Sequence, residues 1–436
     1  MKERLAVVVS LLLACFCPVH AQTAAPTQPG VMRLTLQEAE QLALKNNPQI
    51  SVAKLLSLAQ GQVTREVRSA ELPQSTGNLT AVEPREGGTR IAAGVLNAPN
   101  VLQRAAGGIT AGQLITDFGR TRNLVASAQL REQAQVASEH ATVADVTLAV
   151  DQEFYNALGA QALLEVAQQT VNARQTTADQ VQALTNAKLK SDLDLSFANV
   201  NLAQAKLLLV DATNRKDEAF ANLNALLGFD QQKTYLLADE SGAAVNPPPQ
   251  SGDQLRDQAF HSRPDLVALQ DQWQAQERFR RAEHDLFRPS VSALAAVGGS
   301  PVRVPQITSW YGAAGVNISI PLFNGFQYSA RAKEADYRTA ALEQQVRDLR
   351  DRISRDVEVS WLQARSSYER IGVTTQLLQQ ANLALDLAQT RYKLGLGSIV
   401  ELSQAQLQQT EAAIGNTNAR YSYLSALSLL RFQTGQ

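Results

Sequence analysis

The sequence LTLQEAEQLALKNNPQI occupies residues 34–50, and the sequence DQLRDQAFHSRPDLVAL occupies residues 253–269. A shift of 216 positions places the second stretch on the first, so that Ala43 coincides with Ala259 and Pro48 with Pro264. Self-similarity at a long, fixed spacing indicates a chain built from repeated structural units. The two stretches therefore predict that the protein is a tandem duplication.

The later part of each half repeats with a shift of 207 positions, which places Asp194 on Glu401 and Gly228 on Gly435. The difference of nine positions falls after Pro73, where a hairpin loop can absorb it. A stretch rich in Pro, Gly and Ser separates the two halves and is typical of a connection. We therefore expect a first repeat at residues 34–230, a linker at 231–252 and a second repeat at 253–436.

Each half has the same predicted order of elements. A helix broken by an Asn-Pro or Arg-Pro step comes first, and Pro73 or Pro289 ends it. Short stretches follow in which apolar and polar residues alternate, which is the pattern of β-strands. Long helices with very little Gly and no Pro complete each half. The strands are expected within residues 74–118 and 290–323, and the long helices at 120–187, 191–227, 327–393 and 398–433.

The long helices have the apolar spacing of a coiled coil. Leu195, Ala198, Leu202 and Ala205 follow one another in alternating steps of three and four residues. At about 1.5 Å per residue, a helix over residues 120–187 would be about 100 Å long. Because compact globular domains do not contain helices of that length, we expect long antiparallel coiled-coil hairpins.

The N-terminal residues 1–21 have the features of a secretory signal peptide. Lys2 and Arg4 precede an apolar stretch, and Val19-His20-Ala21 is a small-residue cleavage site. A lipoprotein signal that anchors Cys15 by lipid is the alternative. Residues 22–33 are expected to form an N-terminal tail.

The composition leaves little material for catalysis or for a cofactor. Both cysteines precede residue 22, and the histidines are few and widely separated. No nucleophile–base set, phosphate-binding Gly loop or metal-ligand cluster stands out. The chain has 40 basic and 41 acidic residues without a basic stripe, so nucleic acid is not an expected partner. We therefore expect neither an enzyme nor a protein with a metal or a cofactor.

The four expected strands are long enough to cross a bilayer. No apolar run outside the N-terminal signal segment reaches the length of a membrane helix. Four strands cannot close a barrel, and open edges are not tolerated in lipid. Three protomers would contribute twelve strands, an even number within the usual range of bacterial barrels. Aromatic residues near the strand ends are candidates for contact with lipid at the membrane interface: Phe118, Trp310, Tyr311, Phe323 and Phe326.

These features together resemble the TolC-like outer-membrane efflux protein family. The resemblance rests on the Asn-Pro step, the paired hairpins, the Asp-Phe-Gly-Arg entry to a long helix at residues 117–120 and the stretch YKLGLGSIVEL at residues 392–402. It implies a mainly α protein with a membrane β-barrel part. In this architecture a homotrimer forms a 12-stranded barrel in the outer membrane of a Gram-negative cell, continuous with a periplasmic α-helical barrel. The resemblance further implies docking to a periplasmic adaptor protein and an inner-membrane pump.

The resemblance also assigns roles to the two hairpin turns at the far end of the coiled coil. These turns would form the periplasmic entrance and contact the adaptor, and they contain Leu189, Ser191, Gly395 and Gly397. Family members carry acidic residues three apart that narrow the pore. The matching positions here are Glu401 and Gln404, so a trimer would have one ring of three carboxylates. The alternative is that Glu401 is a solvated residue on a helix surface.

Some family members hold the entrance closed by a latch, in which a tyrosine and an arginine bind an aspartate region of the first hairpin. Tyr392 matches the tyrosine, Gly397 occupies the arginine position, and Asp192 or Asp194 could accept a hydrogen bond from Tyr392. Tyr392 could instead be a residue of the coiled-coil seam. The latch is therefore a hypothesis that this sequence only partly matches.

The predicted function is a passive outer-membrane duct that carries small molecules such as drugs from a pump and an adaptor to the exterior. An outer-membrane duct for type I protein secretion is an alternative within the same class. A coiled-coil structural or adhesive envelope protein is an alternative from a different class, although it would not require duplicated strand hairpins.

Overall fold

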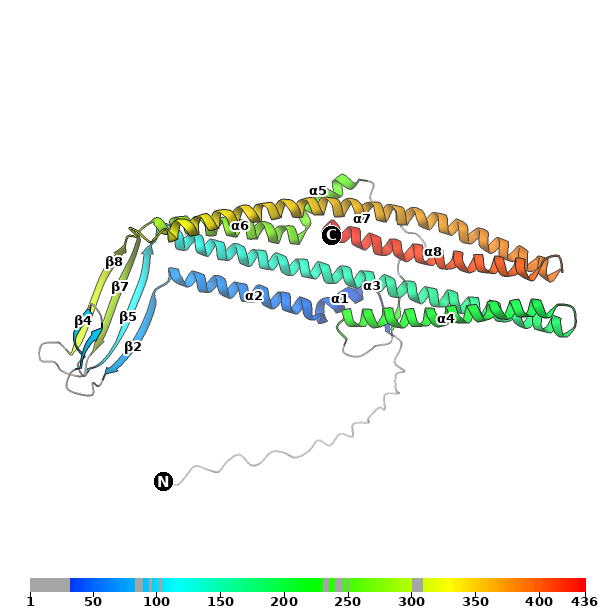
Figure 1. The fold of residues 1–436 in the computed structure, drawn as a ribbon, viewed down its shortest axis with the longest axis horizontal. Coiled ribbons are helices and arrows are strands. Elements are labelled where there is room, and N and C mark those ends of the chain that lie inside the picture. The colour runs from blue at the N-terminus through cyan, green and yellow to red at the C-terminus, as the bar shows by residue number, and fades with distance from the viewer. Residues whose placement is uncertain are drawn as a thin grey trace, which may run out of the picture.

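The computed structural model describes residues 32–82, 89–93, 96–101, 104–229, 235–239, 246–248, 251–299 and 309–436. The molecule is elongated, with a β-sheet at one end and two helix–helix turns at the other (Figure 1). The expected signal peptide and most of the expected N-terminal tail lie outside the described residues. Within the described residues, no helix combines the length and the apolar character that crossing a membrane would require.

Four long helices form two antiparallel hairpins. In the first repeat, α3 (Arg120–Asn186) packs along α4 (Asp192–Leu226), and in the second, α7 (Gln327–Lys393) packs along α8 (Ile399–Gln433). The helices α3 and α7 each contain 67 residues and are therefore about 100 Å long. The predicted coiled-coil fold class is confirmed.

Small residues along the seam bring these helices close together. Ala198, Ala205 and Ala212 of α4 are nearly inaccessible to solvent, as is Leu202. In the second hairpin Ala381, Ala388 and Tyr392 of α7 are buried at the corresponding spacing. The alternating steps of three and four residues in the sequence thus identify the packed face of each helix.

Shorter helices precede the sheet in each repeat. The first repeat contains α1 (Leu36–Asn46), α2 (Pro48–Arg68) and the 3₁₀ helix η1 (Ser69–Glu71). The second contains α5 (Gly252–Ser262), α6 (Pro264–His284) and the 3₁₀ helix η2 (Asp285–Phe287). Asn47 separates α1 from α2, and its side chain accepts a hydrogen bond from the backbone N–H of Gln49, at 2.8 Å. An Asn-Pro step thus ends one helix and caps the next.

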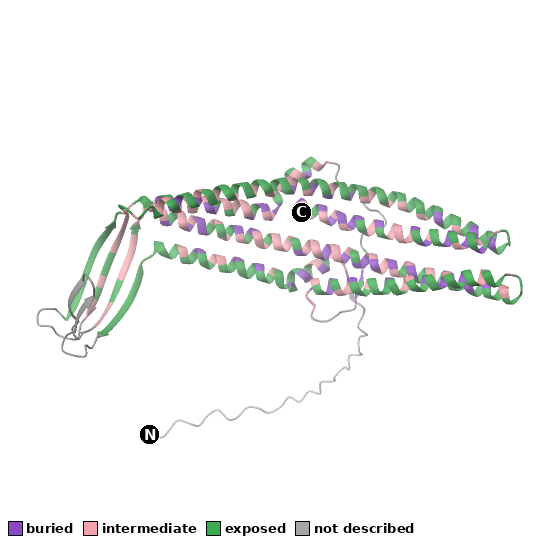
Figure 2. Ribbon diagram, in the orientation of Figure 1, coloured by how far each residue is buried: buried purple, intermediate pink, exposed green. Residues whose placement is uncertain are grey.

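The main sheet has four antiparallel strands in the order β2 (Gln74–Val82), β5 (Arg104–Thr116), β7 (Ser290–Gly299) and β8 (Trp310–Ser319). The central pair, β5 and β7, joins the two repeats. Within the described chain, β2 and β8 each have one edge without a partner strand. The edge strands are exposed, whereas β5 and β7 are largely half-buried (Figure 2).

Two further strand pairs were not expected from the sequence. A separate hairpin of β3 (Thr89–Ala93) and β4 (Leu96–Val101) lies between β2 and β5. The strand β1 (Met32–Leu34) pairs in parallel with β6 (Tyr235–Leu237), which lies in the expected linker. These three-residue strands are too short to show a periodic pattern, and only the pairing of distant segments defines them.

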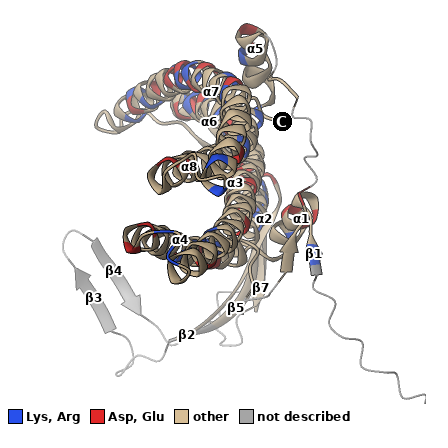
Figure 3. Ribbon diagram, turned by 90° about the vertical axis from the view of Figure 1, so that its right-hand side faces the viewer, with Lys and Arg blue, Asp and Glu red and all other residues tan. Residues whose placement is uncertain are grey.

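The parallel pair of strands and α1 lie on one side of the long helices. Leu34, Tyr235 and Leu237 pack in one buried cluster with Ala39 of α1 and Phe154 of α3. An end-on view shows the helices in a curved arc, with α1, β1 and α5 on its outer side and α4 and α8 toward the opposite side (Figure 3). Acidic and basic residues alternate over the helices in this view, and neither sign dominates one face.

Candidate functional site: the helical tips and the sheet

The two hairpin turns at the tips have closely related backbone conformations. The shift of 207 positions places Lys188 on Gly395, and both residues have positive φ angles, of 62° and 74°. The next backbone N–H groups, of Leu189 and Leu396, donate to Leu184 and Arg391 carbonyls that end the preceding helices. A positive φ is readily adopted by Gly but is uncommon for Lys. The sequence therefore revealed the turn at Gly395 more clearly than the turn at Lys188.

A serine begins the helix that follows each turn, but the two helix starts differ. The hydroxyl of Ser191 accepts from the N–H of Asp194, and the Asp194 carboxylate accepts from the N–H of Ser191, which completes a capping box. Ser398 caps α8 in the same way and accepts from the N–H of Glu401. The Glu401 carboxylate, however, does not complete a capping box with Ser398.

The partner of Glu401 is Arg391, near the end of α7. The Arg391 Nε donates to Glu401 Oε1 at 3.0 Å, and a second guanidinium nitrogen donates to the Leu396 carbonyl at 3.1 Å. A Cβ atom at Gly397 would lie 3.2 Å from the Arg391 Cβ and 3.3 Å from Glu401 Oε2, so glycine leaves room for this pair. The sequence analysis did not identify Arg391. The feature that could have indicated it is its position next to Tyr392, on the other side of the turn from Glu401.

Glu401 and Gln404 lie on the same exposed face of α8. Leu402 and Ala405 beside them are buried, so the face that carries Glu401 and Gln404 points away from the helix seam. Residues three apart are neighbours on a helix surface. Their role as a pore constriction stays a prediction.

Tyr392 is buried between the two hairpins, among Val181 of α3 and Leu402 of α8. Its ring lies 4.3 Å from the Lys190 ammonium. Burial raises the pKa of Tyr392, and the negative charge of Asp194 raises it further. The hydroxyl has no hydrogen-bond partner among the described residues. The structure therefore brings Tyr392 near Asp194 without the hydrogen bond that the latch would require. Asp192 is exposed. The latch stays a prediction.

The expected adaptor-contacting residues lie at the turns themselves. Leu189, Ser191 and Gly395 are exposed, and Gly397 is half-buried. A recess of about 490 Å³ separates the two hairpins just above the turns. Its walls are mainly apolar, and Lys190 and Lys393 lie among its lining residues.

A buried arginine ties the first hairpin to α8 above this recess. Arg174 of α3 is 6% exposed, and it donates to the Gln406 carbonyl at 2.7 Å and to Thr410 Oγ1 at 3.1 Å. Burial lowers the pKa of Arg174 to about 10. The sequence reasoning missed this contact because the partners are 232 and 236 positions apart.

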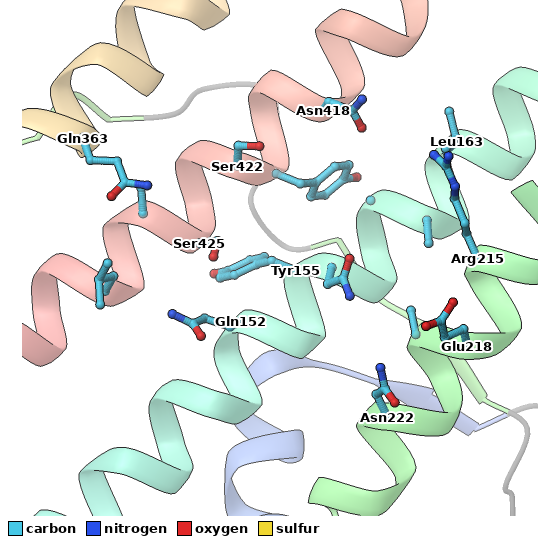
Figure 4. Close-up of a pocket in the computed structure, with 17 residues that line it drawn as sticks. Gln152, Tyr155, Leu163, Arg215, Glu218, Asn222, Gln363, Asn418, Ser422 and Ser425 are labelled. Carbon is cyan, nitrogen blue, oxygen red and sulfur yellow. The ribbon is translucent and has the colours of Figure 1, made fainter. Parts of the chain in front are cut away.

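A polar recess of about 620 Å³ lies farther from the tips, between α3, α4 and α8 (Figure 4). Amide and hydroxyl side chains such as Gln152, Asn418 and Ser425 line it, together with Arg215 and Glu218. On α3 this face lies opposite Val150 and Phe154, which pack toward α1. Because α1 lies on the outer side of the arc, the recess faces the inner side.

The faces of the main sheet differ in polarity. The pairing register groups Val316 and Ile318 with Val291, Val297 and other apolar or small residues on one face. The other face contains mainly Gly, Ala, Ser, Thr and Asn side chains. In the described residues no helix covers either face, and Val316 and Ile318 are more than 60% exposed.

The expected interface aromatics lie at both ends of this sheet. Phe118, Phe323 and Phe326 lie where strands join helices, and Trp310 and Tyr311 begin β8 at the other end. All five are about half exposed or more. Because successive strand residues point to opposite faces, Trp310 lies on the apolar face and Tyr311 on the polar face. The Tyr311 ring lies over Gly298 on the polar face, and contact of these aromatic residues with lipid stays a prediction.

The described residues contain no group of three or more His, Cys, Asp or Glu side chains placed to hold a metal ion. The absence of a cofactor and of catalysis therefore remains an expectation from the sequence. The geometry that the chain does present is an uncovered amphipathic sheet fixed to helical hairpins about 100 Å long. That combination fits the class of outer-membrane ducts.

Comparison with known proteins agrees with this class. A sequence model of the family described as outer membrane efflux protein matches residues 39–229 and 255–436. The chain is therefore a member of the outer membrane efflux protein family, and it is an outer-membrane protein. The two matched ranges correspond to the two halves of the duplication.

Individual relatives are more distant. The outer membrane protein TolC of Escherichia coli is 24% identical over 411 residues, which cover 89% of this chain and 80% of TolC. The alkaline protease secretion protein AprF of Pseudomonas aeruginosa is 25% identical over 334 residues, covering 73% of this chain and 66% of AprF. The open-state structure of the Neisseria gonorrhoeae MtrE outer membrane channel superimposes with a TM-score of 0.77 at 20% identity, covering 92% and 88% of the two chains.

Proposed function

We propose that the protein is a passive outer-membrane duct that exports small molecules such as drugs, and that three copies form the conduit. The observation that carries this proposal is the four-stranded sheet, which has two unpaired edges and an uncovered apolar face in the described part of the chain. Unpaired backbone groups are costly in lipid, so the edges β2 and β8 require partner strands. Pairing β8 of one copy with β2 of the next gives twelve strands from three copies.

The polarity of the sheet supports one orientation of this barrel. The apolar face with Val316, Ile318 and Trp310 would contact lipid, and the face of small and polar residues would line the pore. The aromatic residues at the two ends of the strands would then lie at the two membrane interfaces. On the helices, the inner side of the arc would continue the pore into the periplasm.

The helical tips would form the periplasmic entrance. Glu401 and Gln404 are proposed to face the pore, with the Glu401 charge partly balanced by Arg391 at 3.0 Å. The exposed turns at Leu189 and Leu396 would contact a periplasmic adaptor that connects the duct to an inner-membrane pump. The apolar recess with Lys190 between the hairpins supports a contact surface at this end.

Protein secretion is a second candidate, supported by the similarity to AprF, which is described as an alkaline protease secretion protein. The two functions can be distinguished by the phenotype of a strain from which the gene is deleted. Loss of small-molecule export lowers the minimal inhibitory concentration of several unrelated compounds, whereas loss of protein secretion removes a protein from the culture medium. Complementation with the intact gene must restore whichever property is lost.

The duct itself is tested with the purified protein. We expect native mass spectrometry in detergent to give the mass of three chains, and planar bilayers to show stepwise conductance. A monomer that gives no conductance in either membrane orientation would refute the proposal. Glu401→Gln should lower cation selectivity, whereas Glu411→Gln, an exposed acid on the same helix, serves as the matched control.

A further inference from the structure

Two carboxyl groups face each other where α1 packs against α3. Glu40 of α1 and Asp151 of α3 line the same cavity within hydrogen-bonding contact; Asp151 is 9% exposed, and Glu40 is half-buried. The Oδ1 atom of Asp151 has no donor among the described residues. Two ionised carboxylates cannot donate to each other, so this contact becomes a hydrogen bond only when one of them carries a proton.

Few cations compensate the pair. Ser428 of α8 donates a hydrogen bond to Asp151, and the charge of Arg431, also on α8, acts on both acids. The pair opens onto a cavity of about 830 Å³ that also contains Arg263, but Arg263 is bound to Asp265 at 2.7 Å. The other titratable groups around the pair and the cavity are His140, Asp145 and Tyr155 of α3, Asp265 of α6 and Asp239 beyond β6.

The second repeat lacks this arrangement, although its helices pack in the same way. The shifts of 216 and 207 positions place Arg256 on Glu40 and Glu358 on Asp151. Burial supports this alignment of the two repeats, because it places buried Ala43 on buried Ala259 and buried Val150 on buried Val357. These two positions therefore carry two acidic residues in the first repeat, but one basic and one acidic residue in the second.

We propose that Glu40 and Asp151 share one proton, and that this proton holds α1 against α3, so that α1 loosens as the pH rises toward neutrality. Protonated Glu40 donates to the Asp151 carboxylate and adds a second donor to that of Ser428, whereas the Oδ1 atom otherwise has none. Loss of the proton leaves a negative charge on half-buried Glu40 beside the charge of buried Asp151, and their repulsion favours exposure of Glu40 to water. Separation of α1 would also free the adjoining parallel strands β1 and β6.

The direction of the pH effect follows from the pKa of Glu40. Burial, followed by the Asp151 charge, raises this pKa from 4.5 to about 7 in the packed state. When α1 separates, Glu40 returns to water and to its ordinary pKa. The packed state therefore binds the proton more tightly, and its advantage is lost progressively as the pH rises from about 4.5 to 7. Between pH 5.5 and 8.5 the opening equilibrium constant of α1 should rise on the order of tenfold.

Hydrogen exchange of the full-length protein in detergent tests this proposal, with protection factors corrected for the intrinsic exchange rate at each pH. We expect protection of residues 36–46 to fall on the order of tenfold between pH 5.5 and 8.5. The equivalent helix α5, residues 252–262, is an internal control that should change less than about twofold, because it lacks a buried acid pair.

Variants separate a shared proton from general loosening. Glu40→Gln retains a donor toward Asp151 at every pH, so α1 should stay protected at pH 8.5, and Asp151→Asn should behave similarly. Glu40→Ala should leave α1 weakly protected at both pH values. Equal protection of α1 at both pH values in the wild type, or an unchanged pH response in Glu40→Gln, would overturn the proposal. This test does not depend on whether the protein conducts.

Discussion

Replacing Gly228 by alanine should loosen the junction between the end of α4 and α1. Gly228 has a φ of +69°, and a Cβ atom there would lie 2.8 Å from the Asn46 carbonyl oxygen and 3.0 Å from its carbon. The left-handed conformation costs roughly 1–2 kcal/mol for a residue with a Cβ, and displacing backbone adds roughly 1–3 kcal/mol. We therefore expect Gly228→Ala to destabilise this junction by about 3 kcal/mol.

Hydrogen exchange should detect this change, because side-chain hydrogen bonds join α1 to the end of α4 at the same junction. The Asn46 and Asn47 side chains donate to the Leu227 and Leu226 carbonyls at the end of α4, at 3.5 and 3.2 Å. Displacement of Asn46 disturbs these bonds, so hydrogen exchange should accelerate in residues 36–46 and 219–229. The global unfolding transition should be much less affected, because the change is local.

The duplication provides a repeat experiment and a control. Gly435 has a φ of +74°, and a Cβ atom there would lie 2.8 Å from the Ser262 backbone, so Gly435→Ala should loosen the equivalent junction. Gly372 lies inside α7, where a Cβ atom would meet no described atom outside its own stretch of helix within 4 Å. Gly372→Ala should therefore stabilise that helix by about 1 kcal/mol. Equal hydrogen-exchange rates of residues 36–46 and 219–229 in the Gly228→Ala and Gly372→Ala proteins would refute this reasoning.

Three further substitutions test the tips and the sheet. Ser191→Ala removes the capping box of α4 and should raise the free energy of its first turn by about 1 kcal/mol, measured as faster hydrogen exchange at residues 192–196, with Ser196→Ala as the control. Gly298→Val would place its side chain in the Tyr311 ring and 2.7 Å from the Gly107 carbonyl oxygen, so the yield of folded protein should fall; the double variant with Tyr311→Ala should recover only part of it, and no recovery at all would contradict the Tyr311 contact. Arg391→Gln removes the cation beside Glu401, so cation selectivity in planar bilayers should increase if Glu401 lines the pore, and an unchanged reversal potential would place Glu401 elsewhere.

The sequence alone determined the architecture because its signals are local and repeated. Pro73 and Pro289 end helices, the steps between Leu195 and Ala205 identify the seam, and alternation in residues 315–320 identifies a strand. Each signal acts within a few residues and appears in both halves. The class of protein followed from the order of these elements, and the match over both halves of the duplication agrees with it.

Only the tertiary structure determined which distant side chains meet. The pairing of β1 with β6, the contact of Arg174 with α8 and the pair of Glu40 and Asp151 join segments that are remote in the chain. Arg391 and Glu401 are only ten residues apart, yet their contact depends on the turn conformation and on the small size of Gly397. Periodicity specifies which face of a helix is buried, but it carries no information about what lies opposite that face. Helix packing decides this, and here it placed two acids together in one repeat and an acid and a base at the same positions in the other.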